Sequence, residues 1–345
     1  MALASGLGGQ LSIDLGALAR NWRALDKVSA GALTGAVVKA DAYGTGIAVA
    51  SKALHAAGAR FFFAATPDEA MAVRAAVPDA HIFVLNGLYP GAANLYVRQN
   101  LMPIISSVAM LEEWLAKCLE RNEAYPSAFH FDTGMNRLGF RLNEAAQVRD
   151  RIQALGYTPQ MVMSHLACAD QPNHEKNRTQ LALFASVMNQ FPGVPASLAN
   201  SAGLMTGRDY HFQMVRPGIA LYGGRAVNGR KNPMAPVVTL HVPILQVKEA
   251  RTGESVGYGA TQSLSRDSRL AIISHGYADG FFRSLSGSNM RPGGKVAIRG
   301  KICPVIGRVS MDQVTVDITE LGPDIPNPGE GAEVLGNLIS VDDQA

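Results

Sequence analysis

One stretch near the N-terminus decides the fold: Ala36-Val37-Val38-Lys39, followed at once by Ala40-Asp41-Ala42-Tyr43-Gly44-Thr45-Gly46. The short β-branched run predicts a buried strand, and the lysine stands at its C-terminal end, where it opens into a turn punctuated by glycine. In α/β proteins the carboxyl ends of the strands carry the chemistry. An amine at such a position can form an imine, so Lys39 is the first candidate catalytic residue.

Short apolar runs alternate with amphipathic segments from Ser12 to Pro236, and this alternation is typical of βα units. Eight strands are expected, at residues 33–39, 60–64, 81–85, 102–105, 128–132, 160–165, 195–200 and 213–217. Helical patterns cover residues 45–57, 67–76, 108–121, 143–155 and 175–190. We therefore predict a TIM-like (β/α)8 barrel over residues 12–236, with a doubly wound open sheet as the alternative.

The character of the sequence changes after Pro236. Short strands split by Gly and Pro are expected at residues 237–249, 269–273, 296–299, 313–318 and 333–335. This pattern indicates a C-terminal mostly β domain over residues 237–345, and residues 1–11 are a candidate to pair with it.

Composition excludes several classes of protein. The chain has 345 residues, 47% hydrophobic and 17% charged, which is enough apolar material for a barrel and a smaller domain. A formal net charge of +3 gives no nucleic-acid surface. The three cysteines suggest neither a disulfide framework nor a metal site, and no apolar run is long enough for a membrane span. We expect a cytoplasmic protein without a metal and with a small-molecule partner.

Polar residues gather at the predicted strand ends. Lys39 ends strand one, Asp132–Arg137 follows strand five, and the remaining ends carry His165, Asn200–Ser201 and Arg216–Ile219. Each has an ordinary structural explanation of its own, but their joint placement on one rim indicates an active site. Backbone at Ser201, Gly218 and Ile219 lies where barrels hold phosphate. A lysine that forms an imine and a phosphate site on the same rim imply pyridoxal 5′-phosphate, with Arg216 available to face the pyridine nitrogen.

Seven motifs in order carry a resemblance to a known family. They are Val38–Gly44 (VKADAYG), Asp132–Gly139 (DTGMNRLG), Ala199–Gly203 (ANSAG), Arg216–Gly223 (RPGIALYG), Val256–Thr261 (VGYGAT), Gly276–Gly280 (GYADG) and Gly307–Gln313 (GRVSMDQ). The chain resembles the alanine racemases, which are barrel-type pyridoxal-phosphate enzymes.

The resemblance implies a two-base racemisation of L- and D-alanine that supplies D-alanine for peptidoglycan. Lys39 would serve one face of the substrate, and Tyr258 from the partner subunit of a homodimer would serve the other. The implied cofactor-binding residues are Lys39, Tyr43, His165, Asn200, Ser201, Arg216, Gly218 and Ile219, and the implied substrate-binding residues are Arg137, Tyr277, Met311 and Asp312.

Three departures from the family pattern stand out. His130 occupies the position of a lysine that is carbamylated in some relatives, and Ser197 that of a histidine. Relatives also run on to a tyrosine that contacts the cofactor phosphate, whereas this sequence stops at Ala345, so we expect a weaker phosphate site or a substitute group. The alternatives are a racemase of another small amino acid such as serine, a related amino-acid decarboxylase, and a non-catalytic binding protein for the same cofactor.

Overall fold

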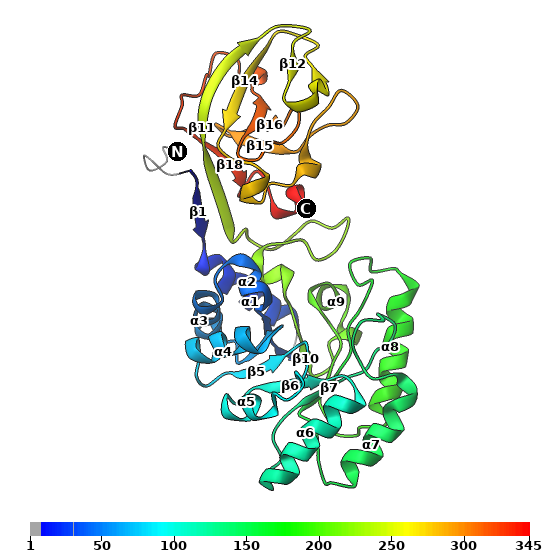
Figure 1. Ribbon diagram of the computed structural model, residues 1–345. Coiled ribbons are helices and arrows are strands. Elements are labelled where there is room, and N and C mark those ends of the chain that lie inside the picture. The colour runs from blue at the N-terminus through cyan, green and yellow to red at the C-terminus, as the bar shows by residue number, and fades with distance from the viewer. Residues whose placement is uncertain (1–7, 30) are drawn as a thin grey trace. The chain divides into compact units, whose positions relative to one another are not determined.

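The structure is a computed structural model that describes residues 8–29 and 31–345. The chain divides into two compact units, one from Leu15 to Ala235 and one that combines the start of the chain, up to Asp14, with Pro236–Ala345 (Figure 1). No helix in these described ranges combines the length and the apolar character needed to cross a membrane.

The first unit is a closed barrel of eight parallel strands. They are β2 (Leu33–Thr34) continued by β3 (Ala36–Val37), β4 (Phe61–Ala64), β5 (His81–Val84), β6 (Met102–Ile105), β7 (Ala128–His130), β8 (Met161–Met163), β9 (Ala196–Ser197) and β10 (Met214–Val215). The sheet runs in sequence order from β3 to β9, and β10 pairs with β2. Backbone bonds from Gln213 to Ala196 and from Arg216 to Ala199 join β10 to β9 and close the ring. The predicted barrel is confirmed, and the open-sheet alternative is wrong.

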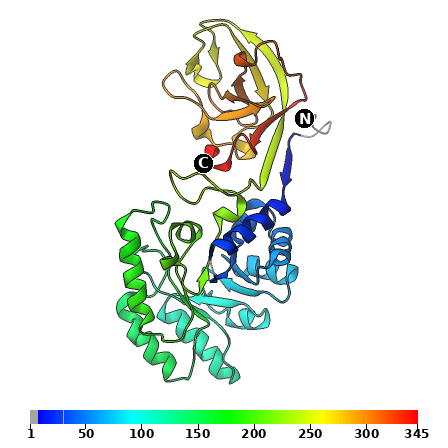
Figure 2. The same cartoon turned by 180° about the vertical axis from the view of Figure 1, so that it is seen from behind.

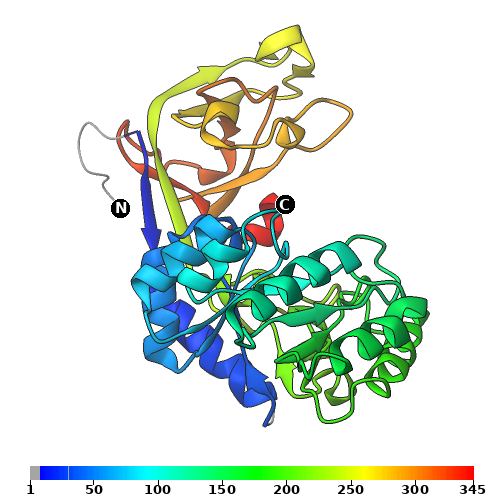
Figure 3. The same ribbon diagram turned by 60° about the horizontal axis from the view of Figure 1, so that its bottom comes forward.

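Helices lie around the outside of these strands (Figures 1 and 3). They are α1 (Leu15–Ser29), α3 (Ile47–Ala57), α4 (Pro67–Ala76), α5 (Ala93–Arg98), α6 (Val108–Arg121), α7 (Ala145–Gln153), α8 (Glu175–Met188) and α9 (Ser201–Thr206), with α2 (Lys39–Gly44) a single turn at the rim. Short 3-10 turns are η1 (Leu142–Glu144), η2 (Arg208–Tyr210) and η3 (Ile219–Tyr222). Two helices start on strong caps: Thr66 and Glu69 form a capping box on α4, and Ser107 caps α6.

Large apolar side chains fill the barrel interior. Phe63 and Phe83, from neighbouring strands, stack with ring centroids 4.9 Å apart, and Val37, Met102, Ile104, Met161, Met163 and Met214 pack with them. These side chains fill the barrel interior, so a ligand is expected to bind at the ends of the strands.

The second unit is an antiparallel β barrel, as the sequence predicts. Its strands are β1 (Gln10–Ile13), β11 (Val238–Ala250), β12 (Ser255–Val256), β13 (Gln262–Ser263), β14 (Ser268–Ile273), β15 (Lys295–Ile298), β16 (Lys301–Pro304), β17 (Val314–Asp317) and β18 (Gly331–Leu335). The order is β16-β15-β18-β11-β14-β17, and a bridge between Val305 and Val316 closes it. β1 pairs with β11, which Figure 2 shows from behind.

Short turns and one helix complete this unit: η4 (Tyr258–Ala260), η5 (Tyr277–Asp279), η6 (Arg283–Leu285), η7 (Thr319–Leu321) and α10 (Val341–Gln344). Residues of alternating strand positions, among them Val296, Ile298, Val314 and Val316, form its core.

Candidate active site

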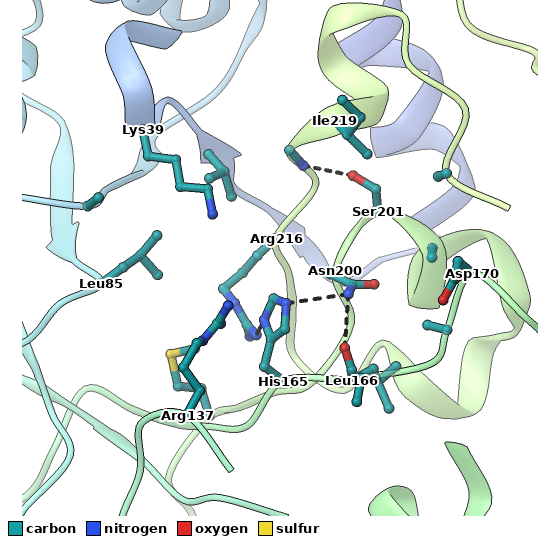
Figure 4. Close-up of a pocket in the computed structure, with 18 of the residues that line it drawn as sticks. Lys39, Leu85, Arg137, His165, Leu166, Asp170, Asn200, Ser201, Arg216 and Ile219 are labelled. Carbon is teal, nitrogen blue, oxygen red and sulfur yellow. Dashed lines mark hydrogen bonds between the residues drawn. The ribbon is translucent and has the colours of Figure 1, made fainter. Parts of the chain in front are cut away.

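One cavity of about 630 Å³ opens at the carboxyl ends of the barrel strands. Lys39 lies two residues after β3, His165 two residues after β8, and Arg216 directly after β10. Arg137, on the loop after β7, and Asn200, before α9, line the same cavity. The structure thus brings together the rim residues that the sequence singles out, and Lys39 points toward the middle of the cavity (Figure 4).

The turn after Lys39 has an unusual backbone. Four consecutive residues, Ala40 to Tyr43, have φ between 52° and 57° and lie in the left-handed region. Each such residue costs about 1–2 kcal/mol, because its Cβ crowds the following carbonyl oxygen. The sequence predicts a turn here but carries no sign of its handedness. Strain of this kind is kept where the neighbouring structure holds it and function uses it.

The left-handed turn ends at Tyr43, which also lines the cavity. Its ring stacks on Tyr222, with centroids 4.5 Å apart at 24°, and Tyr222 donates to the Val37 carbonyl. A Cβ at Gly218 would lie 2.4 Å from the Tyr43 hydroxyl, so only glycine lets the two segments approach this closely. Burial raises the pKa of the Tyr43 phenol, which stays protonated and able to donate.

Ser201 ties together the two segments expected to hold phosphate. Its Oγ accepts the Gly218 amide at 2.8 Å and the Ala220 amide at 3.4 Å. The Gly218 amide, which we expected to face a phosphate, is therefore used within the protein, while the Ser201 hydroxyl keeps its own proton to donate. Asn200 caps α9 through the Gly203 amide at 3.0 Å. Ile219, also predicted here, lines the cavity.

Arg216 is a buried cation, and no carboxylate within residues 8–29 and 31–345 forms an ion pair with it. Only 3% of its surface is exposed. Its guanidinium donates to neutral acceptors: the Ser197 hydroxyl, the Ser164 carbonyl at 2.6 Å and the Leu198 carbonyl at 3.5 Å. Burial lowers the pKa of this guanidinium to about 9, so it is still charged at neutral pH. The Ser197 departure thus keeps a contact to Arg216, and an unpaired buried charge marks a functional site.

His165 is a neutral imidazole that lies between Arg216 and Asn200. Arg216 Nη2 lies 3.5 Å from its Nδ1, and the Asn200 amide nitrogen lies 3.4 Å from its Nε2. Burial and then the Arg216 charge keep the pKa of His165 well below its ordinary value. Because arginine can only donate, the Nδ1 atom accepts in that contact. Gln180 fixes the His165 carbonyl from α8 at 2.9 Å.

Arg137 is presented by a loop built around one carboxylate. Asp132 accepts the amides of Gly134, Met135 and Asn136, each at 2.8 Å. Within the described residues Arg137 makes no ion pair, so its charge is open to a ligand. His130, which also lines the cavity, is buried, and that burial lowers its pKa to about 4, with the Arg216 charge adding to the effect.

Sequence reasoning missed several residues of the cavity. Asp170 is the one carboxylate among its lining residues, against the four cations Lys39, Arg137, Arg216 and Arg225. The Asp170 carboxylate accepts the Asn228 amide at 2.8 Å. A single Asp beyond a strand end gave no signal on its own. This charge balance favours an anionic ligand.

The other predicted residues lie on the β unit. Tyr258 is 70% exposed, in a turn between Gly257 and Gly259, both of positive φ. Tyr277 and Met311 are also exposed and are held together by the bonds from Tyr277 N to the Ser310 carbonyl and from Ala278 N to the Met311 carbonyl. Asp312 follows on the same exposed loop. None of the four lines the cavity of the barrel.

A parallel barrel with a lysine, a buried arginine and a mostly cationic cavity at its carboxyl rim defines a barrel enzyme of the kind that carries an organic phosphate cofactor. Comparison with known proteins then makes the assignment specific. The family described as alanine racemase, N-terminal domain, matches residues 13–226, and alanine racemase, C-terminal domain, matches residues 237–345.

Individual relatives agree with this. A biosynthetic alanine racemase of Agrobacterium fabrum is 46% identical over 97% of this chain and 88% of its own length. A catabolic alanine racemase of Rhizobium johnstonii is 43% identical over 99% and 90%. The crystal structure of the Bartonella henselae alanine racemase with covalently bound pyridoxal phosphate superposes with a TM-score of 0.90 at 34% identity, covering 98% of this chain and 93% of that one. The chain belongs to the alanine racemase family, and it is an enzyme of that family.

Proposed function

We propose that the protein interconverts L- and D-alanine with pyridoxal 5′-phosphate bound to Lys39. The observation that carries the proposal is the Lys39 amine directed into a cavity whose other charges are mostly cationic. When bound, the cofactor supplies a ring that withdraws electrons and so acidifies the Cα–H of an amino acid. The cationic lining suits both its phosphate and a substrate carboxylate.

The residues of the cavity fit this cofactor. Tyr43 and Ser201 have hydroxyl protons to donate to a phosphate, and Gly218 leaves room for it. Arg216, with His165 and Asn200 beside it, would face the pyridine ring. Arg216 cannot lend a proton as a carboxylic acid would, so it would leave the ring nitrogen unprotonated and restrain side reactions.

Racemisation needs an acid/base group on each face of Cα. Lys39 would serve one face. For the other face we propose Tyr258 of the partner subunit, in a homodimer with shared active sites. The high exposure of Tyr258 supports this role, since a phenol that protrudes on a glycine-flanked turn can enter a second copy's cavity. The charge of Arg216, together with the hydrogen bonds of the neutral His165, would stabilise its anion.

Substrate contacts follow from the same arrangement. Arg137, free of an ion pair within the described residues, would bind the substrate carboxylate. The backbone amide of Met311, together with Asp312 and Tyr277, would contact the substrate from the β unit of the partner. His130 cannot carry a carbamate, so the Asp132 loop alone would orient Arg137.

The use of the product is part of the proposal. Relatives include biosynthetic and catabolic enzymes. We propose the biosynthetic role, supply of D-alanine for peptidoglycan, in the cytoplasm. A D-alanine requirement of cells that lack this protein is the expected phenotype.

The test combines covalent mapping with polarimetry. Borohydride reduction of the purified protein should attach the cofactor to Lys39 and to no other lysine, and L-alanine should lose its optical rotation without release of carbon dioxide. A K39A variant is the control for both readouts. Attachment elsewhere, release of carbon dioxide, or a faster reaction with serine than with alanine would overturn the proposal in favour of a related enzyme.

A further inference from the structure

The left-handed turn from Ala40 to Tyr43 needs an external support. Contacts inside it and at its exit are local: the Ala42 amide donates to the Val38 carbonyl at 2.8 Å, and the Thr45 hydroxyl to the Ala42 carbonyl at 2.6 Å. Because these bonds join residues within the turn and next to it, they do not fix the position of the turn relative to the rest of the barrel. A strained segment stays in place only when the structure around it fixes its position.

Glu69 supplies that fixed point. Its Oε1 accepts the Ala40 amide at 2.7 Å, which ties the turn to α4. The Asp41 carboxylate also accepts the Ile47 amide at 2.7 Å, but that bond joins the turn only to α3, the helix that follows it directly in the chain. Ala40 is the first residue of the left-handed run and directly follows Lys39. The contact is a charge-assisted bond, which is stronger than a bond between neutral groups.

The other oxygen of Glu69 anchors the carboxylate to the barrel. Oε2 accepts the Ala65 amide at 2.8 Å, directly after β4, and the Thr66 amide at 3.4 Å. Since β4 pairs with β3, the strand that leads to Lys39, Glu69 joins the turn to the neighbouring strand of the same sheet. Thr66 in turn accepts the Glu69 amide at 3.3 Å and fixes the start of α4.

We propose that Glu69 is a positioning residue for this enzyme: its carboxylate clamps the left-handed turn and thereby places both Lys39 and Tyr43. The turn begins after one of these residues and ends on the other, and both line the cavity. A capping box alone would need only the bond to Thr66. The second oxygen, directed at Ala40 29 residues away, has no part in helix capping. The inference rests on the proposed function, because it concerns how Lys39 is held for the cofactor.

Three variants separate the clamp from the cap. E69A removes both. E69Q keeps the shape but has only one acceptor oxygen, so either Ala40 or Ala65 loses its partner. T66A is the matched control, because it removes the side-chain cap of α4 and leaves both carboxylate contacts in place. Thermal unfolding of the apoprotein measures the structural cost of each, and titration with pyridoxal phosphate measures binding to the apoprotein.

We expect E69A to weaken pyridoxal phosphate binding by about tenfold or more, E69Q by less, and T66A by under about twofold at a comparable fall in the unfolding midpoint. Adding A40G to E69A should recover part of the loss, because glycine adopts the left-handed conformation without a Cβ penalty. If E69A does not fold, E69Q with and without A40G replaces it.

Equal binding by E69A and T66A, or the absence of recovery with A40G, would overturn the clamp. These outcomes are distinct from failure of the proposed function, in which wild-type protein itself would not carry the cofactor on Lys39 after borohydride reduction. If wild type is labelled at Lys39 and the variants bind alike, only the role of Glu69 is wrong.

Discussion

Replacing Gly218 by alanine tests how the cavity holds phosphate. The new Cβ would lie 2.4 Å from the Tyr43 hydroxyl, whereas ordinary contact begins at 3.4 Å, so the hydroxyl must move by about 1 Å (3.4 − 2.4). The stack on Tyr222 blocks retreat of the ring, which leaves the cavity as the way out. Overpacking of this kind costs about 1–3 kcal/mol. Since the displaced hydroxyl enters the phosphate position, we expect the cost to weaken pyridoxal phosphate binding by about 5- to 150-fold.

A second variant makes this argument refutable. In a Y43F background the obstructing oxygen is absent, and the next atoms are Cζ of residue 43 at 3.3 Å and Val37 Cβ at 3.4 Å. There G218A should change the dissociation constant by less than about threefold. Titration of all four proteins with the cofactor measures the cycle, with G207A as control, because its Cβ would meet no atom within 4 Å. An equal effect of G218A in both backgrounds would refute the steric reasoning.

Two further predictions concern His130, the last residue of β7, and the loop that follows it. His130 has a pKa of about 4 in the folded protein against an ordinary 6.5, so the unfolded chain binds its proton first and stability falls as pH drops from 6.5 toward 4. H130Q should reduce that loss by up to about 3 kcal/mol in urea unfolding, and an unchanged pH dependence would contradict the assignment. D132A frees three amides around the loop that presents Arg137. It should raise the KM for alanine about tenfold with a smaller change in kcat, and a fall in kcat alone would count against this role.

The barrel was predictable because its strands are short apolar runs at regular intervals. The structure has all eight within one to three residues at either end, for example Phe61–Ala64 against residues 60–64. Helix α1 was not predicted, although Leu18, Trp22 and Leu25 are buried at helical spacing. Its apolar residues are interspersed with Ala and Arg, so the helical periodicity of this segment is less marked than the apolar runs that predict the strands.

The site was predictable only in part. Lys39, His165 and Arg216 could be placed on one rim because parallel strands share their direction. The left-handed turn could not be predicted, since alanine, which stands at positions 40 and 42, rarely adopts positive φ, and the Ala40 amide donates to the carboxylate of Glu69, 29 residues further along the chain. Tertiary contacts of this kind leave no local pattern in the sequence.

The central claim is that Lys39 and Tyr258 act together across two subunits. Its most direct test mixes two variants, K39A and Y258F, each expected to be nearly inactive alone. After unfolding and refolding together, half of the dimers contain one copy of each, and each of these has one site of two with both residues intact. Racemisation of alanine should therefore recover to about a quarter of the wild-type rate. No recovery on mixing, or full activity of Y258F alone, would contradict the account.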